Sequence, residues 1–329
     1  MGGKMPLSHR AVSLLIASCA AVLAGVSFAR AEDPPQWAFP INPPGLPAPK
    51  DDGKIHTLPG SAAQFSFAQL RDFFSPPDWY PEDHPAMPPL VAHGAQPGSF
   101  ACGFCHLPTG NGRPENANIA GLPASYIIQQ VQDFKSGARR SSLPDRYPQS
   151  LMTKLSVQAA TEPGLAEAAA YFASLKPKPV TKVVETDAIP RVEISHWILK
   201  KSEAAGTEPI AGRLVEVPDD FAGFDVRDGR VTYTAYVPLG SLAKGEALVK
   251  TGGSGTTIAC GICHGPGLKG LGPVPPIAGR SPSYLARQLF DIKSGARNGE
   301  SAALMKPVVA QLTNEDFVAI TAYLASLAP

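Results

Sequence analysis

The sequence has no excess of charge of either sign, because 29 basic residues face 28 acidic residues in a chain of 329. Proteins that bind nucleic acid normally carry a basic face, so this balance argues against nucleic acid as a partner. Beyond residue 31 the sequence also lacks an apolar run long enough to span a bilayer. An apolar content of 44% is too high for a wholly disordered chain. The composition therefore indicates a folded protein, of about two domains by its length.

The first 31 residues have the pattern of a targeting segment. The first ten contain two basic side chains and no acid, and a small, apolar stretch then leads to Ala29-Arg-Ala31. A basic start, an apolar middle and a small-x-small ending are typical of a secretory signal peptide. We therefore predict a signal peptide at 1–31 and a periplasmic mature chain with 26 basic and 28 acidic residues. An uncleaved anchor and lipidation at Cys19 remain as alternatives, and we expect membrane association only through this segment.

Cysteine is scarce beyond residue 31, where the four copies lie in two C-x-x-C-H motifs, at 102–106 and 260–264. Paired cysteines in an exported chain can form disulfides, a redox dithiol or part of a zinc site. The histidine after the second cysteine instead matches the covalent attachment signature of c-type haem. Thiols three positions apart on one helical turn can meet the two vinyl groups of a haem, and the next residue presents its imidazole to the iron. We predict two covalently attached haem c groups. Their attachment residues are Cys102, Cys105, Cys260 and Cys263, and their first iron ligands are His106 and His264.

The chain contains an internal duplication, because a shift of 158 residues aligns the two motifs and much of the sequence around them. Residues 119–139 and 277–297 are identical at twelve of 21 positions, including Lys-Ser-Gly-Ala-Arg in both copies. After a small length change, Leu151-Met152 matches Leu304-Met305. Two homologous domains in one chain follow from this pattern.

The duplication sets the domain boundaries that we predict. One domain spans 88–176 and the other spans 242–329, whereas 32–87 is a proline-rich N-terminal extension and 177–241 is an inter-domain connection. Residues 32–60 show no helical period, so we expect them to wrap the surface. Residues 61–74 form a short amphipathic helix at best.

Local signals predict helices in the duplicated domains. Ser281-Pro282 is typical of a helix start, and Gly137 and Gly295 are typical of left-handed helix ends. Thr313-Asn-Glu-Asp316 resembles a capping box that opens the last helix. In the connection, Asp228-Gly229 lies between two strand-like segments, so we predict a β-hairpin on that turn.

Methionine is also rare beyond residue 31, where Met87, Met152 and Met305 are the three copies. Met152 and Met305 fall at equivalent repeat positions, 46 and 41 residues after the motif histidines. A lone methionine is most often core filler. A symmetric pair, placed between a glycine-containing loop and the last helix of each copy, is better explained as two thioether ligands of iron. The alternatives are histidines with no histidine counterpart in the other copy, namely His56, His84, His93 and His196.

Taken together, these segments resemble class I cytochrome c domains. Those domains combine C-x-x-C-H with an Ile-Ala-Gly segment, a helix ending in Lys-Ser-Gly, a late methionine and a final helix with a tyrosine. The tandem arrangement is most similar to the cytochrome c4 family, over roughly 88–175 and 242–328. The resemblance implies an all-α fold around each haem and periplasmic electron transfer, commonly toward a terminal oxidase. In that family a carbonyl often accepts the proton of the ligating histidine, a place that Pro275 and Ala117 take here.

We therefore expect an all-α protein of two tandem class I cytochrome c domains, with a proline-rich N-terminal extension and a partly β inter-domain insert. Pro88-Pro89, the long extension and the long connection depart from the family pattern. They leave the partner, rather than the cofactor, open.

The leading functional hypothesis is a periplasmic dihaem electron carrier that is not an enzyme. It would pass single electrons between periplasmic redox proteins, among them a terminal oxidase or a dehydrogenase. One alternative is an electron-accepting subunit of a periplasmic dehydrogenase. Another is a dihaem peroxidase, but that enzyme needs an open sixth position on one iron, and two equivalent methionines argue against it.

The motifs also suggest where partners dock. Transient redox complexes use small interfaces, below about 1,200 Å², so we expect docking patches at exposed haem edges. The residues best placed to border them are Phe104 and Leu107 in the first domain and Ile262 and Pro266 in the second. The alternative is that Phe104 and Ile262 pack on their haems.

Overall fold

The computed structural model describes residues 1–3 and 33–329. The predicted signal peptide, its cleavage site after Ala31 and the lipidation alternative at Cys19 fall in 4–32 and lie outside the described residues. Within 33–329, no helix has both the length and the apolar character needed to cross a membrane.

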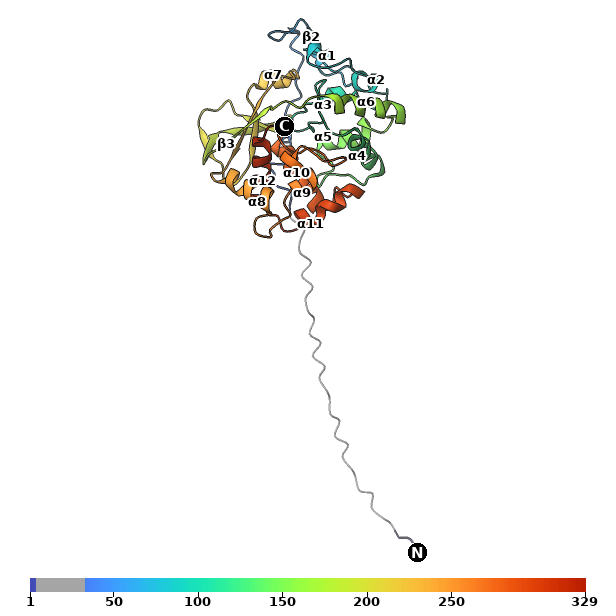
Figure 1. Cartoon of the computed structure of the whole chain (residues 1–329), viewed down its shortest axis with the longest axis vertical. Coiled ribbons are helices and arrows are strands. Elements are labelled where there is room, and N and C mark those ends of the chain that lie inside the picture. The colour runs from blue at the N-terminus through green and yellow to red at the C-terminus, as the bar shows by residue number, and fades with distance from the viewer. Residues whose placement is uncertain (4–32) are drawn as a thin grey trace. The chain divides into compact units, whose positions relative to one another are not determined.

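The two repeats form similar sets of helices, which occupy two neighbouring regions of the molecule (Figure 1). The first repeat contains α2 (Pro89–Ala92), α3 (Cys102–His106), α4 (Ala124–Ser136), α5 (Tyr147–Leu151), the π-helix η2 (Met152–Ser156) and α6 (Glu162–Ser174). The second contains α8 (Ser241–Thr251), α9 (Gly261–His264), η3 (Pro266–Leu268), α10 (Pro282–Lys293), η4 (Glu300–Met305), α11 (Lys306–Val309) and α12 (Asn314–Ser326). The first helix of the first repeat, α2, is shorter than its counterpart α8 in the second repeat, which agrees with the departure from the family pattern at Pro88-Pro89.

The predicted helix boundaries are confirmed where a local capping signal exists. The Ser281 side chain accepts a hydrogen bond from the Tyr284 backbone N–H at the start of α10. Thr313 and Asp316 form a reciprocal capping box on α12. Gly137 and Gly295 both have a φ of 78°, the left-handed conformation that glycine adopts without strain.

Each repeat has its own apolar core. In the second, α8 crosses α12 so closely that a Cβ on Gly245 would lie 2.0 Å from the carbonyl oxygen of Ala319. Phe317 and Leu324 of α12 are buried there. In the first repeat, α4 packs against α6, with Phe172 at the centre of the cluster.

The N-terminal extension is partly internal, so the expectation that 32–60 wraps the surface is wrong for its first part. Ala38 is fully buried and Phe39 is 1% exposed in the core of the second repeat. The Phe39 ring meets the Phe290 ring edge-on, with centroids 5.7 Å apart. The Ala38 carbonyl also accepts a hydrogen bond from the buried Arg287 guanidinium at 2.9 Å. Burying these side chains offsets the absence of regular structure in this segment.

The extension and the connection contain the remaining elements. The extension holds β1 (Ile55–His56), β2 (Phe65–Ser66), α1 (Phe67–Leu70) and the 3₁₀ turn η1 (Pro81–Asp83). The connection holds β3 (Thr181–Glu185), β4 (Ala188–Pro190), β5 (Val192–Ser195), β6 (Ile198–Lys201), β7 (Thr207–Pro209), β8 (Val215–Pro218), α7 (Phe221–Asp225) and β9 (Tyr233–Val237). The all-α expectation therefore applies to the two repeats and not to the whole chain, and the strands of the connection agree with the partly β insert that the sequence predicts.

The predicted hairpin on Asp228-Gly229 is wrong. Asp220 accepts a hydrogen bond from the Gly223 N–H and caps α7, so the segment before the turn is helical. The strand after the turn, β9, is the middle of a three-stranded sheet, parallel to β3 and antiparallel to β8. The connection does contain an antiparallel β5–β6 pair, between Val192 and Lys201.

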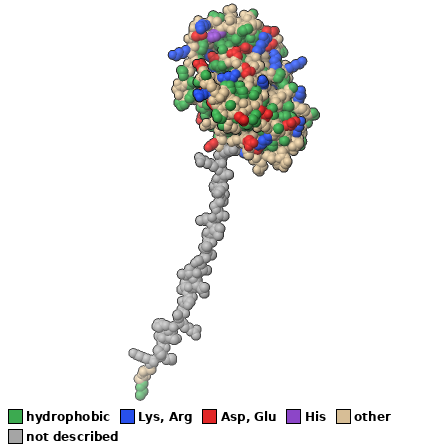
Figure 2. Space-filling model, turned by 90° about the vertical axis from the view of Figure 1, so that its left-hand side faces the viewer, with side chains coloured by type: hydrophobic (Ala, Val, Ile, Leu, Met, Phe, Trp, Pro, Cys, Tyr) green, Lys and Arg blue, Asp and Glu red, His purple; other side chains and the backbone are tan. Residues whose placement is uncertain are grey.

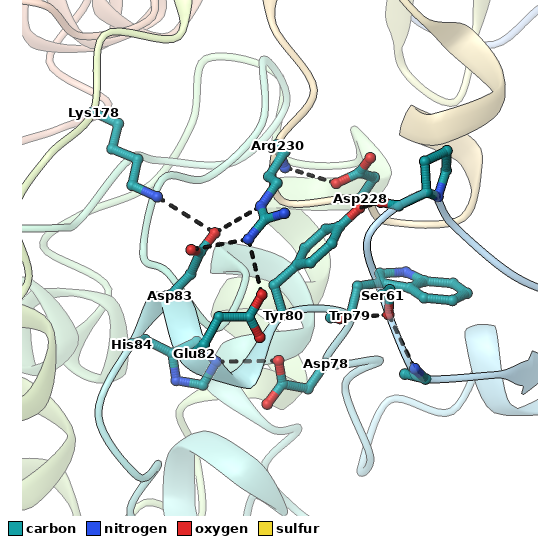
Figure 3. Close-up of polar contacts among 12 residues, drawn as sticks. Ser61, Asp78, Trp79, Tyr80, Glu82, Asp83, His84, Lys178, Asp228 and Arg230 are labelled. Carbon is teal, nitrogen blue, oxygen red and sulfur yellow. Dashed lines mark hydrogen bonds and ion pairs between the residues drawn. The ribbon is translucent and has the colours of Figure 1, made fainter.

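A polar cluster joins the extension to the connection (Figure 3). Arg230 donates to Asp83 at 2.9 Å and to Glu82 at 3.0 Å, and its guanidinium lies 3.5 Å from the centroid of the Tyr80 ring. Nearby, the Trp79 indole N–H donates to the Val226 carbonyl at 2.8 Å. These contacts hold the two additions to the tandem fold against each other.

Trp79→Ala should lower the free energy of unfolding by about 3–5 kcal/mol, the range for removing a buried aromatic side chain. Trp79 is 2% exposed and packs edge-on against Phe65, with centroids 4.6 Å apart. Urea denaturation of the purified protein measures the change. Leu239→Ala is the control, because a side chain that is 61% exposed should change stability by no more than about 0.5 kcal/mol. Equal effects of the two variants would show that the extension is not held by Trp79.

His84 predicts a pH dependence of stability. A hydrogen bond from its Nε2 to Asp78, 3.1 Å long, raises the pKa of His84, with burial acting against it (Figure 3). Protonated His84 therefore stabilises the folded state fully below the unfolded pKa of about 6.5, and this contribution is lost as pH rises through the folded pKa. Urea midpoints of wild type should fall more than those of Asp78→Asn as pH increases above about 6.5. If the urea midpoints of the two proteins change equally with pH, the His84–Asp78 hydrogen bond is not the source of the pH dependence.

Candidate functional site

The first site is a cavity at α3. Its lining includes Cys102, Cys105 and His106 from α3 and Met152 from η2, four positions at which the sequence predicts haem attachment or iron ligands. His106 is the one histidine of that lining, and the four alternative ligands do not border it. Met152 begins a single π-helical turn, a distortion found frequently at functional sites.

Each motif histidine is oriented by a backbone carbonyl. Nδ1 of His106 lies 2.8 Å from the Ala117 carbonyl oxygen, and Nδ1 of His264 lies 2.8 Å from that of Pro275. Since a carbonyl only accepts, each Nδ1 carries the hydrogen and leaves Nε2 free as a ligand. Burial lowers the pKa of both imidazoles, which keeps them in the neutral form that a metal requires. The carbonyls are those that the family resemblance implies.

No disulfide links any of the four cysteines in the described part of the chain. Burial raises the pKa of Cys102 to about 12 and that of Cys260 to about 11. Both thiols therefore lie in a buried setting.

The walls of the first cavity suit a flat, largely apolar group. Leu122, Ile127, Val131 and Phe172 line it, and the His106 and Phe172 rings meet edge-on with centroids 6.3 Å apart. Polar side chains gather elsewhere on the lining, among them Arg139 and Tyr126. The cavity thus combines apolar walls with two thiols, a neutral imidazole and a thioether. This set of groups fits a haem c.

The second motif has the same local structure with a different exposure. His264 is 8% exposed, and Cys260 and Met305 both pack against the core of this repeat. Cys263 is exposed, and Ile262 beside it is 69% exposed. In the first motif, Phe104 is 1% exposed and Leu107 3%, so the expectation that these two border an exposed edge is wrong.

Besides the first repeat, three other parts of the chain line the first cavity, which the sequence did not predict. Phe73 comes from the extension. Trp197 and Arg227 come from the connection, and Tyr284, Gln288 and Asp291 come from α10 of the second repeat. The sequence signal that could have identified the α10 residues is the repeated Tyr and Gln of the aligned helices. No local pattern singles out the two residues of the connection.

The two repeats meet through a duplicated polar contact. The Lys-Ser-Gly-Ala-Arg segments pair as an antiparallel bridge between Arg139 and Arg297. Each arginine then reaches the tyrosine and glutamine of the other repeat: Arg139 donates to Tyr284 at 3.0 Å and Gln288 at 2.8 Å, and Arg297 donates to Tyr126 and Gln130, both at 2.8 Å. The similarity that marks the duplication thus also forms the contact between its copies.

Comparisons with known proteins agree with this geometry. The cytochrome c family model matches residues 242–328. Cytochrome c4 of Azotobacter vinelandii is 27% identical over 240 residues, which are 72% of this chain and 89% of that protein. A thiosulfate dehydrogenase electron acceptor of Thiomonas intermedia is 27% identical over 236 residues, 70% of this chain and 81% of that protein.

A third relative, which is about as long as one of the two domains, is more similar in sequence than the two just named. Cytochrome c-554(548) of Halomonas halodenitrificans is 36% identical over 88 residues, which are 26% of this chain and 96% of that protein. Nearly its whole length is therefore matched by one segment of this chain. Together with the similarity to cytochrome c4 across most of the sequence, this match shows that the chain belongs to the cytochrome c family, as a dihaem class I cytochrome similar to cytochrome c4.

Proposed function

We propose that this protein is an exported electron carrier that binds two haem c groups and passes single electrons between redox proteins. The observation that carries the proposal is the repetition of one site. Each C-x-x-C-H histidine donates from Nδ1 to a backbone carbonyl 2.8 Å away, and each repeat has a methionine at the equivalent later position. Transfer between proteins, rather than catalysis, is what two similarly liganded sites support.

The residues take distinct parts in this proposal. The cysteine pairs 102/105 and 260/263 attach the haems, His106 and His264 supply one iron ligand each, and Met152 and Met305 supply the other. A haem bound this way provides an iron that alternates between ferric and ferrous forms, with a thioether raising the potential. The backbone carbonyls of Ala117 and Pro275 hold the imidazole orientation through both forms.

An electron-accepting role in a dehydrogenase is the second candidate. The similarity to a protein named thiosulfate dehydrogenase electron acceptor favours it, over 81% of that protein's length. The extension 32–87 and the connection 177–241 would then serve in docking to the catalytic subunit. Copurification under native conditions separates the candidates, because a subunit should elute with its enzyme and a free carrier should elute alone.

Export and ligation can be tested on the purified protein. A cleaved signal peptide predicts a mature chain that begins at Glu32 and is recovered from the periplasmic fraction. Carbon monoxide tests the ligands, because it binds only where the sixth iron position is open or displaceable. The reduced spectrum should not change under carbon monoxide, whereas a strong change would favour a peroxidase.

A further inference from the structure

The two C-x-x-C-H motifs differ in what covers them. Phe104 and Ile262 occupy the same motif position, directly before the second cysteine. Phe104 is 1% exposed and Ile262 is 69% exposed. The duplication should give both domains the same outer face, so a segment outside the repeats must cover the first one.

The cover over the first motif comes from both additions to the tandem fold. The Arg227 guanidinium, from the connection, lies 3.6 Å from the centroid of the Phe104 ring and donates to the Phe104 carbonyl at 2.8 Å. The centroid of the Phe73 ring, from the extension, lies 4.6 Å from the centroid of the Phe104 ring. The Phe104 side chain, which corresponds to the exposed Ile262 of the second motif, is therefore buried.

This cover is held in place by its own contacts. Arg71 forms an ion pair with Asp225 at 2.8 Å, two residues before Arg227. The indole N–H of Trp79 donates to the Val226 carbonyl at 2.8 Å, directly before Arg227. Two contacts from the extension thus hold the segment directly before Arg227, and with it the Arg227 side chain over the first motif.

The face of the second motif is instead open and apolar. Four large apolar side chains are exposed around it: Ile258 at 42%, Ile262 at 69%, Leu271 at 57% and Leu304 at 74%. The loop that carries Leu271 is tied to the motif by a hydrogen bond from the Gly270 N–H to the His264 carbonyl at 2.8 Å. Thr257, next to Ile258, donates to the Val308 carbonyl at 2.6 Å and ties the motif's entry to the segment after Met305.

Two basic residues flank the open face in sequence, because Lys269 lies two residues before Leu271 and Lys306 lies two residues after Leu304. Lys269 and Lys306 are exposed, and among the described residues neither forms an ion pair. Glu300, at the start of η4, is the exposed acid nearest in sequence to Met305. On the face shown in Figure 2, basic and acidic side chains are interspersed. A partner surface that is apolar with an acidic border would complement the open face.

We propose that redox partners dock only on the second domain, on the surface formed by Ile258, Ile262, Leu271 and Leu304, and that the first site exchanges electrons through the second. The inference rests on the proposed function. The partner is a redox protein whose contact surface is apolar with acidic residues around it. Its small contact area is typical of transient redox complexes, below about 1,200 Å².

A gold electrode coated with a mixed methyl- and carboxylate-terminated monolayer reproduces this partner chemistry. Ile262→Glu and Leu304→Glu should each slow electron transfer to the electrode about tenfold or more, because a lost apolar contact weakens association by that order. Leu155→Glu is the matched control, since Leu155 is 41% exposed in the first domain and lies three residues after Met152. Its rate should equal that of wild type.

Two results would overturn the docking proposal: an unchanged rate in both second-domain variants, or an equal slowing by Leu155→Glu. A titration with small diffusible mediators, made on the same samples, tests the carrier function separately. Uptake of two electrons by every variant supports the proposed function whatever the electrode shows. Absence of uptake in wild type would contradict the carrier function itself.

Discussion

Replacing Cys102 and Cys105 together with alanine is expected to halve the covalently bound haem of the purified protein. The two thiols lie one helical turn apart on α3 and face the same cavity as His106, so no other described cysteine can replace them there. The second motif lies in a separate core and should keep its haem. Haem absorbance after denaturation, per mole of chain, measures the loss.

The matched variant is the alanine pair at Cys260 and Cys263. It should also retain half of the haem, and the two double variants combined should retain none. Loss of all haem from either double variant alone would mean that the sites do not load independently. Zinc in place of haem in the wild-type protein would contradict the whole assignment.

Replacing Met152 or Met305 with alanine should remove about half of the weak near-infrared band that arises from sulfur ligation of ferric iron. Met152 lines the same cavity as His106, and Met305 packs against the core that also contacts Cys260. Loss of the thioether should also lower the potential of the altered site and let added ligands bind to it. Near-infrared absorption of the oxidised variants measures the first effect.

Met87→Ala provides the control for both variants. Met87 packs against the core of the first repeat but is not part of the cavity lining, so its substitution should leave the band intact. If Met152→Ala and Met305→Ala also leave it unchanged, the thioether assignment is wrong. The histidines His56, His84, His93 and His196 would then need individual replacement.

The parts of the structure that the sequence predicts are those specified by residues a few positions apart. The Thr313–Asp316 capping box, the Ser281 cap and the left-handed Gly137 each depend on one helix turn of chain. The motif cysteines and histidine lie within five residues, and the duplication supplies a second copy against which each position can be compared. Repetition is why Met152 and Met305 could be chosen over unmatched histidines.

The unpredicted parts depend on contacts between distant residues. Strand β9 pairs with β3 in parallel, and Asp228-Gly229 carries no information about that partner. Likewise, Phe39 is in a proline-rich segment whose composition indicates surface, yet its ring packs on Phe290. Arg227 looks like an ordinary surface cation in the sequence, and only the fold places its guanidinium over Phe104.

The contrast between local signals and contacts of distant residues also explains why the two sites are not equivalent. The repeats are similar enough to give both histidines the same carbonyl contact, at 2.8 Å in each. The extension and the connection then cover one motif and leave the other open. Sequence comparison of the repeats alone therefore predicts the chemistry of each site but not its accessibility.

We propose that one chain carries two haem c groups that each accept one electron. A potentiometric titration of the purified protein, followed by its visible spectrum and normalised to chain concentration, tests it most directly. We expect uptake of two electrons per chain, with a low-spin spectrum from the first to the last point. Uptake of one electron or none, or a high-spin component in the oxidised protein, would contradict it.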